Sequence, residues 1–259
     1  MNATLTVLGS GTSMGVPTIG CTCEVCRSTD PHDRRTRPSI MIEWDGRRVL
    51  IDTTPDFREQ ALREGINRVD AVLYTHGHAD HILGLDDLRP LSFPRVTGGP
   101  KIPLYANAKT AAVLRSVFKY IFANDYKFGG IAQVDLHDLH GPVELFGRTF
   151  SPVTVIHGEA EIYGFRFGTA AYLTDFSSIP EKSMEQLREL DILFLDALRH
   201  TPHPTHSTVA NSLSIVEKLK PKRTFFTHIC HDLGHEATNA GLPPNVRLAY
   251  DGLRLEFEL

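Results

Sequence analysis

Residues 76–81 read HGHADH, and this stretch decides the fold and the chemistry that the rest of the chain must support. It follows an apolar segment, 70–75, that is typical of a buried strand. His76 and His78 are two residues apart, so an extended backbone points both imidazoles the same way. The segment therefore presents two nitrogen ligands from the end of a strand.

The second half of the motif offers another pair of ligands. Asp80 and His81 lie where a helix over 82–85 is predicted to begin, and this geometry can offer them to a second metal ion. Imidazole and carboxylate together suit Zn²⁺, Mn²⁺ or Fe²⁺. The motif thus predicts two neighbouring metal ions, one for each pair.

Later apolar segments of the chain also end in a polar side chain with metal-binding capacity. The residues that follow them are His157, Asp175, Asp196 and His228. Side chains presented from strand ends are a common way to build a rigid site. The predicted ligands are, for one ion, His76, His78 and His157; for the other, Asp80, His81 and His228; and, between the two, Asp175.

The apolar patterns predict a single α/β domain that spans residues 1–259. Strands fall into an early block and a late block, with helices beside both. We therefore expect two sheets packed face to face with helices outside. The predicted helices cover 55–65, with Thr54 as its cap, and 107–122, 180–190 and 209–219.

Composition places limits on the class of protein. The formal net charge of −4 argues against a general nucleic-acid binder. No run of 18 apolar residues is present, and residues 1–5 lack the features of a signal peptide, so we expect a cytoplasmic protein with no membrane partner. Three of the four cysteines cluster in a loop over 20–27, which in a reducing compartment favours metal binding over disulfides.

The cysteine cluster has the spacing C-x-C-x₂-C and predicts a structural zinc site. Its members are Cys21, Cys23 and Cys26. Tetrahedral zinc needs a fourth ligand, and the candidates are His231, Cys230, His235 and His32. We favour His231, because it follows His228 by three residues and would tie the loop to a predicted active-site ligand.

These motifs resemble the metallo-β-lactamase superfamily: a strand, then H-x-H-x-D-H, then a late His, Asp and His. The resemblance spans the chain and implies a four-layer αβ/βα sandwich of two mixed β-sheets flanked by helices, with a dinuclear site at one edge. Asp52 follows a predicted strand and matches the first aspartate of that family. The match implies that Asp52 supports ligands or a bound water from behind.

A narrower resemblance is carried by residues 9–26, 76–81, 173–178 and 225–231, which read GSGTSMGVPTIGCTCEVC, HGHADH, LTDFSS and FFTHICH. They resemble the phosphoribosyl cyclic phosphate phosphodiesterase (PhnP-like) family. The resemblance implies two active-site metal ions (manganese or zinc), a structural zinc completed by His231, and a homodimer. It implies opening of a cyclic ribose phosphate by hydroxide that the metals generate.

One further histidine is a candidate catalytic residue beside Asp80 and Asp52. His206 resembles the histidine that related phosphodiesterases place over the scissile phosphate, where it protonates the leaving oxygen or stabilises the transition state. Asp196 could orient it. The expected partner is a small phosphodiester.

Two other functions fit the same motifs. A tRNA 3′-end nuclease shares the dinuclear site, but its family grips tRNA with a long basic arm, and the only candidate here, 92–103, is short. A non-hydrolytic accessory protein of quinone-cofactor biosynthesis shares the cysteine loop. That protein resembles a version of the family whose catalytic motif is degraded, whereas every predicted ligand is present in this chain. A thioesterase or lactonase on this scaffold is a third alternative.

Overall fold

The computed structural model describes residues 2–93, 100–123 and 130–259, and two mixed β-sheets run through these parts of the chain. The first sheet has the strand order β14-β1-β2-β3-β4-β5-β6. Its strands are β1 (Asn2–Gly9), β2 (Ser39–Trp44), β3 (Arg47–Ile51), β4 (Ala71–Leu73), β5 (Ile102–Ala106), β6 (Val134–Asp138) and β14 (Arg254–Glu258).

The second sheet has the order β13-β12-β11-β10-β9-β8-β7. Its strands are β7 (Val143–Leu145), β8 (Arg148–His157), β9 (Ala160–Phe167), β10 (Ala170–Leu173), β11 (Ile192–Asp196), β12 (Arg223–Thr227) and β13 (Val246–Leu248). Strands β10 to β13 run parallel to one another, whereas β7, β8 and β9 form antiparallel hairpins.

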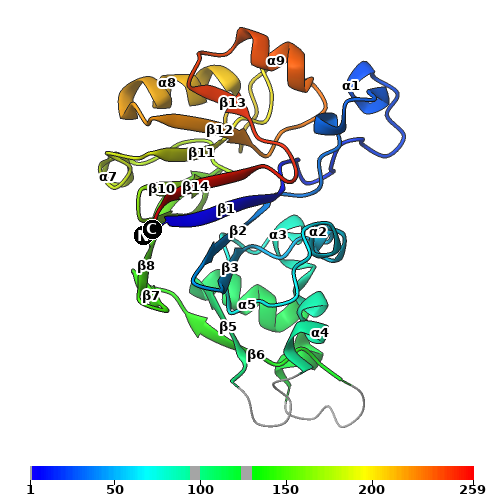
Figure 1. Cartoon of the computed structure of the whole chain (residues 1–259), viewed down its shortest axis with the longest axis vertical. Helices are drawn as coiled ribbons and strands as arrows, with labels where there is room; N and C mark the ends of the chain where they lie inside the picture. Colours follow the sequence, from blue (N-terminus) through cyan, green and yellow to red (C-terminus); the bar gives the residue numbers. More distant parts are fainter. Residues whose placement is uncertain (1, 94–99, 124–129) are drawn as a thin grey trace.

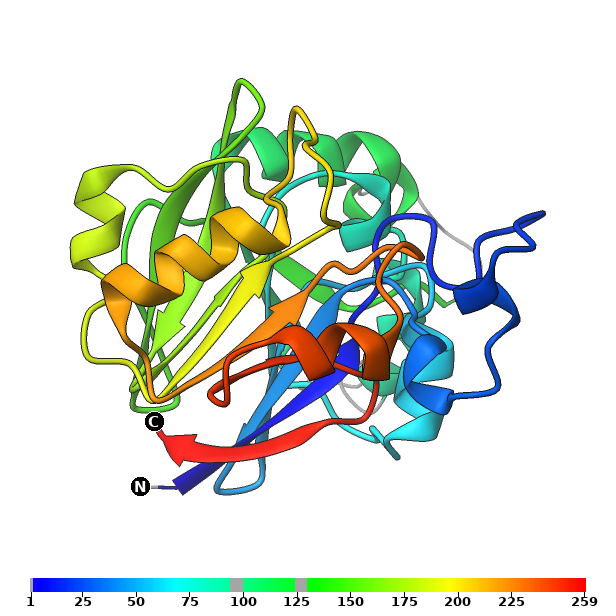
Figure 2. The same cartoon turned by 90° about the horizontal axis from the view of Figure 1, so that it is seen from above.

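Helices cover the outer face of each sheet (Figures 1 and 2). Beside the first sheet lie α2 (Phe57–Arg63), α3 (Ala79–Ile82), α4 (Arg89–Ser92), α5 (Ala108–Val117) and α6 (Lys119–Phe122). Beside the second lie α7 (Glu181–Glu185), α8 (Val209–Leu219) and α9 (His235–Gly241), while α1 (Glu24–Arg27) belongs to an N-terminal loop that projects from the body. The 3₁₀ turns are η1 (Pro31–Asp33) and η2 (Leu85–Leu88).

Apolar side chains point alternately to the two faces of each strand, and this alternation produces three apolar layers. In β11, Ile192 and Phe194 face the core between the sheets, whereas Leu193 and Leu195 face the layer under α7 and α8. The side-chain period of two in a strand accounts for this division. A third apolar layer lies between the first sheet and helices α2, α3 and α5. The arrangement confirms the predicted four-layer αβ/βα sandwich.

Several helix boundaries differ from prediction. The helix expected over 107–122 is two helices, because the backbone turns at Phe118 (φ −105°, ψ 40°) and buries its ring. The helix expected over 55–65 is shorter, and its N-cap is Asp56; Thr54 instead accepts a hydrogen bond from the Asp56 N–H (3.1 Å).

The helix after the HGHADH motif begins earlier than predicted. Asp80 and His81 lie within α3 rather than before a helix over 82–85. The helix ends before Gly84, whose N–H donates to the Thr53 carbonyl (3.0 Å). A Cβ at Gly84 would meet the Thr54 carbonyl oxygen at 2.0 Å, so only glycine allows this close approach.

Two further observations bear on the sequence predictions. None of the helices in the described part of the chain has the length and apolar character needed to span a membrane. Of the segment 92–103, considered above as a possible RNA-gripping arm, residues 94–99 lie outside the described residues.

Candidate metal centres

The predicted ligands meet at one edge of the two sheets because the strands that carry them run parallel. In the first sheet β3 is parallel to β4, which leads to the 76–81 segment. In the second, β8 is antiparallel to β9 and β9 to β10, so β8 shares the direction of β10, β11 and β12. The carboxyl ends of all these strands therefore open onto the same edge.

Three of the residues at this edge have a left-handed backbone. The φ angles are 66° at Asp52, 57° at Asp175 and 58° at His228. Such a conformation is uncommon for residues other than glycine and is concentrated at functional sites. Each residue directly follows, or lies one residue beyond, a buried strand, and the turn aims its side chain inward from the sheet edge.

The first candidate centre contains His76, His78 and His157. One ring nitrogen from each lies within 4.8 Å of the others. The closest pair is His76 Nε2 and His78 Nδ1 at 2.9 Å, and the rings of His78 and His157 are 5.1 Å apart. The structure therefore brings together the three imidazoles predicted to share one ion.

The second candidate centre contains Asp80, His81, Asp175 and His228, all of them buried. His81 Nε2 lies 3.2 Å from an Asp80 oxygen and 3.3 Å from an Asp175 oxygen. His228 Nε2 lies 3.2 Å from the other Asp175 oxygen, which is 4.0 Å from His76 Nε2. Asp175 thus reaches toward both centres, as expected of a bridging ligand.

Unpartnered buried atoms test whether this donor set fits a metal. Asp80 Oδ2, His81 Nε2 and His228 Nε2 are buried without a hydrogen-bond partner among the described residues. Buried polar atoms almost always have a hydrogen-bond partner, so several unpartnered ligand atoms around one point indicate a bound ion. Distances of 3.2–3.6 Å between these atoms match ligands about 2.1 Å from a shared metal. The residues fit divalent metal ions.

The electrostatics of the second centre agree with this interpretation. Burial opposes ionisation of Asp175, but His228 and His81 hold the pKa of its carboxyl well below its usual range. Burial also disfavours a charged His228, yet Asp175 and Asp80 raise the pKa of its imidazole to about 9. Without a metal, protons on imidazole balance the carboxylates. A bound cation would take that place, so metal binding should release protons.

Asp52 supports His81 from behind. Its carboxylate lies 2.7 Å from His81 Nδ1 and accepts hydrogen bonds from the N–H and the hydroxyl of Thr75, each at 2.8 Å. This contact places the proton on Nδ1 and leaves Nε2 free for a metal. The sequence did not single out Thr75, because a threonine before the motif carries no ligand signal.

His157 is oriented by a backbone group that the sequence also could not reveal. Its Nδ1 lies 2.9 Å from the Thr205 carbonyl oxygen. Gly158 (φ 63°) permits this contact, since a Cβ there would meet Thr205 Cγ2 at 2.9 Å. The loop before His206 is thereby held against the first centre.

His206 lies over both centres. Its ring stacks on His228 (centroids 4.6 Å apart, 12° between planes) and lies 4.9 Å from the His157 ring. Its Nδ1 is 2.8 Å from a carboxylate oxygen of Asp196, which is fully buried. The geometry leaves Nε2 of His206 as the nitrogen available to a substrate, consistent with the predicted role.

The cysteine loop forms a separate candidate zinc centre. His231 Nδ1 lies 3.2 Å from Cys21 Sγ and 3.5 Å from the sulfurs of Cys23 and Cys26. The N–H of Cys26 donates to Cys23 Sγ and lowers the pKa of that thiol to about 7, which favours a metal-binding thiolate. Of the four candidates for the last ligand, the structure brings only His231 to the three sulfurs within the described chain.

The zinc centre and the second centre are connected through residues 228–233. Ile229 exchanges backbone hydrogen bonds with Ser10 and Thr12. The buried guanidinium of Arg35 donates to the carbonyls of Cys230 (3.0 Å) and Leu233 (2.7 Å). The N-terminal loop therefore holds the backbone that presents both His228 and His231.

Cys26→Ala should remove one zinc ion per chain and lower the free energy of unfolding by about 3 kcal/mol. The matched control is Cys230→Ala, which removes another buried thiol, next to His231 in the chain but outside the ligand set. Metal analysis and chemical denaturation would check both variants. Loss of zinc from the Cys230 variant alone would contradict the assignment.

A cavity of about 200 Å³ opens beside the first centre. His76, His78 and His157 line it together with Lys109, and the remaining wall is largely apolar, formed by Val113, Ala160 and Ile162 among others. A second cavity, of about 240 Å³, shares Asn107, Lys109 and Glu161 with it. The two cavities adjoin, since they share these residues, and we call the pair the trench.

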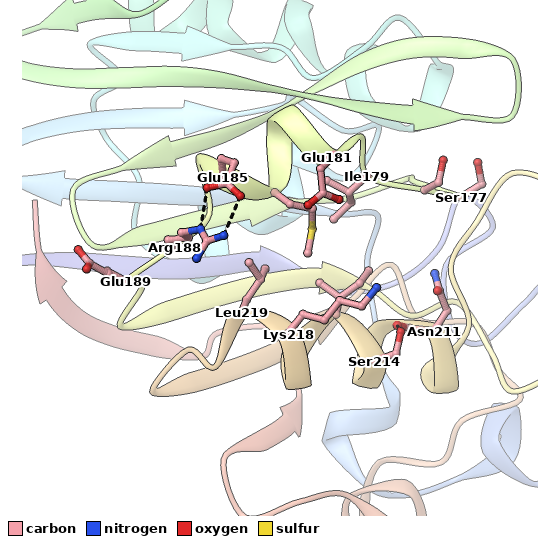
Figure 3. A pocket seen from close by; sticks show the side chains of 13 residues that line it. Ser177, Ile179, Glu181, Glu185, Arg188, Glu189, Asn211, Ser214, Lys218 and Leu219 are labelled. Carbon is pink, nitrogen blue, oxygen red and sulfur yellow. Dashed lines mark hydrogen bonds and ion pairs between the residues drawn. The ribbon is translucent and has the colours of Figure 1, made fainter.

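A larger groove lies elsewhere, between α7 and α8 (Figure 3). It measures about 610 Å³, and its walls carry the ion pair of Glu185 and Arg188 (2.7 Å). None of the candidate ligands lines it. The volume of a cavity therefore does not identify the functional site. The metal-binding side chains that converge at the edge of the sheets identify it.

Comparison with known proteins agrees with the fold. Residues 47–229 match the profile of the Beta-lactamase superfamily domain. A crystal structure described as a new diphosphatase from the PhnP family is 71% identical, with a TM-score of 0.95 and coverage of 100% of this chain and 98% of that chain. Zinc-bound PqqB from Methylobacterium extorquens shares the fold at 22% identity (TM-score 0.75, 97% and 99% covered).

A curated relative differs in length. An octanoyltransferase from Porphyromonas gingivalis is 38% identical over 252 residues, which is 95% of this chain and 50% of that protein. The chain thus spans half the length of that relative, whose name describes a larger protein.

Proposed function

Because this chain belongs to the beta-lactamase superfamily, and within it to the PhnP family, we propose that it hydrolyses a small phosphodiester, with a cyclic ribose phosphate as the leading substrate. Family and donor set together support a metal-dependent hydrolase. One observation carries the proposal: seven ligands converge in two groups, and the His206 ring stacks on His228 of one group and makes a T-shaped contact with His157 of the other.

The proposed chemistry needs two divalent ions in the first and second centres and one zinc in the cysteine loop. When bound, the active-site ions would activate water and neutralise charge on the phosphate. Asp52 holds the His81 ring in the tautomer that a ligand requires. Asp196 holds His206, which donates a proton from Nε2 to the leaving oxygen.

The trench would receive the part of the substrate beyond the reacting phosphate. Its apolar wall, with Val113 and Ile162, suits a sugar or base, and Lys109 offers an exposed ammonium group. Lys109 forms no ion pair with the described residues, so its charge is available to an anionic group.

Lys109→Ala is expected to raise the KM for anionic substrates about tenfold, because one charge-assisted hydrogen bond is lost. Lys109→Arg should restore most of the affinity. Lys218→Ala, in the groove between α7 and α8, serves as the control. Steady-state kinetics would check this, and an unchanged KM in Lys109→Ala would remove the residue from the substrate site.

A specific observation favours a second candidate, hydrolysis of a diphosphate. The 71%-identical structure is described as a diphosphatase. A diphosphate and a cyclic phosphodiester both present an electrophilic phosphorus with anionic oxygens and a leaving oxygen, so the same ligands and His206 would serve either. The difference would lie in the trench and in the pKa of the leaving group.

The decisive experiment compares substrates on manganese-loaded and zinc-loaded protein. Adenosine 2′,3′-cyclic phosphate, ribose cyclic phosphates, adenosine diphosphate, a linear diester and a precursor tRNA would be assayed together. Preference for the cyclic phosphates supports the proposal, and preference for the diphosphate supports the second candidate. Cleavage of precursor tRNA alone would make the protein a nuclease, and inactivity on all of them would overturn the phosphohydrolase assignment.

A further inference from the structure

A separate set of metal-binding side chains lies outside the centres described above. His32 belongs to η1, and His235 and Glu236 begin α9. One ligand atom of each lies within 4.8 Å of the others. Two imidazoles and a carboxylate are a donor set that Zn²⁺ and similar ions accept.

The best-buried member of this set has an unsatisfied nitrogen. His235 is only 5% exposed, and its Nδ1 has no hydrogen-bond partner among the described residues. A buried ring nitrogen without a partner is rare and requires an explanation. Coordination through Nδ1 would supply one.

The spacing of the two rings also suits a shared ion. The centroids of His32 and His235 are 4.5 Å apart, the same separation as for His76 and His78 in the first centre. The Tyr250 ring packs against both, at 4.2 and 5.7 Å, and holds them in place.

Neighbouring carboxylates support this arrangement from outside. Asp30 accepts the backbone N–H of His32 at 2.9 Å, and the same oxygen lies 3.5 Å from His32 Nδ1, so Nε2 is the nitrogen that faces away from Asp30. Asp33 accepts the backbone N–H of His235 at 2.9 Å. Asp33 also pairs with Arg35 at 2.8 Å, so the nearby guanidinium charge is compensated.

We propose that His32, His235 and Glu236 form a further binding site for Zn²⁺ or a similar divalent transition-metal ion, with a fourth position open to solvent. Such an ion would fasten the η1 loop to α9. That loop leads from the cysteine cluster to Arg35, which supports residues 228–233. The site would therefore stabilise the N-terminal loop, and it does not depend on which substrate the enzyme hydrolyses.

The test measures zinc content and zinc-dependent stability on the full-length protein. Wild type, His32→Ala and Glu236→Gln are equilibrated with buffered micromolar free Zn²⁺, and bound zinc is counted by mass spectrometry. Wild type should hold one ion per chain more than either variant. Raising free Zn²⁺ should also raise the Tm of wild type by several degrees more than that of the variants.

The changed side chains are partly or fully exposed, so the variants should fold. His137→Ala is the matched control, since His137 is an exposed histidine 3.5 Å from a carboxylate, that of Asp135. Retention of the extra ion in this control supports the site. Equal zinc content in wild type, His32→Ala and Glu236→Gln would overturn the proposal, as would loss of the ion in the control.

Discussion

Asp80→Ala should abolish phosphodiester hydrolysis, lowering kcat/KM by about a thousandfold or more, since groups that merely support a ligand already contribute about 10–100-fold. Asp80 lies on α3 and places one carboxylate oxygen 3.2 Å from His81 Nε2 and 3.6 Å from His228 Nε2. Its neighbours hold the pKa of this carboxyl below its usual range although burial opposes ionisation, so it is a charged ligand at any working pH.

The role of Asp80 can also be measured without an activity assay, through the metal content of the protein. Without Asp80, the second centre keeps His81 and His228 but loses the one carboxylate that it does not share, because Asp175 also reaches toward the first centre; its ion should be held much more weakly. Metal analysis should therefore show one ion fewer per chain, with the cysteine-loop zinc retained. Asp87→Asn, a half-buried acid in the following 3₁₀ turn, is the matched control and should keep both metal content and activity.

Two outcomes would contradict this prediction. An Asp80→Ala protein with a tenth or more of wild-type activity would show that the second centre is dispensable. Full metal content together with lost activity would show that Asp80 is not a metal ligand and acts in another role.

The ligands could be predicted from the sequence because each follows a recognisable buried strand. Val153 to Ile156 and Thr224 to Thr227 are short apolar runs, and each leads directly to a histidine. Parallel strands bring their carboxyl ends to one edge of a sheet, so residues that follow different strands in the sequence lie close together in space. The apolar pattern of each strand and this one rule of topology were enough to predict the seven ligands.

Strands β6 and β13 escaped prediction because their stability comes from distant partners, whereas the edge strand β14 lies where the sequence predicts a strand, over 254–257. Strand β6 carries exposed polar residues and pairs with β5, which contains Pro103. Strand β13 has only three residues beside β12. Where the sequence pattern is this weak, pairing with a neighbouring strand determines whether a strand forms, and the local sequence does not reveal that pairing.

The supporting contacts of the site were equally hidden. The Thr205 carbonyl is a backbone group that every residue carries, and a single threonine such as Thr75 gives no ligand signal, so neither contact can be recognised in the sequence. The left-handed turns at Asp175 and His228 depend on long-range packing. His231 was favoured by its proximity to His228 along the chain, and the structure brings it to the three cysteine sulfurs.

His206→Ala should lower kcat by about 10²- to 10³-fold while KM changes little, as expected for removal of a proton donor. The ring lies over both centres without belonging to the seven predicted ligands, so the metal content should stay at its wild-type value. Asp196→Asn should have the same direction and a smaller effect, because the ring remains but its Nδ1 partner changes.

The choice of leaving group separates proton donation from a structural role. A nitrophenolate departs without protonation, so a nitrophenyl diester should be hydrolysed by His206→Ala at nearly the wild-type rate, whereas a ribose cyclic phosphate should not. Equal losses on both substrates would instead assign His206 to binding or to shaping the site. His200→Ala, an exposed histidine on the same loop, is the control and should leave both rates unchanged.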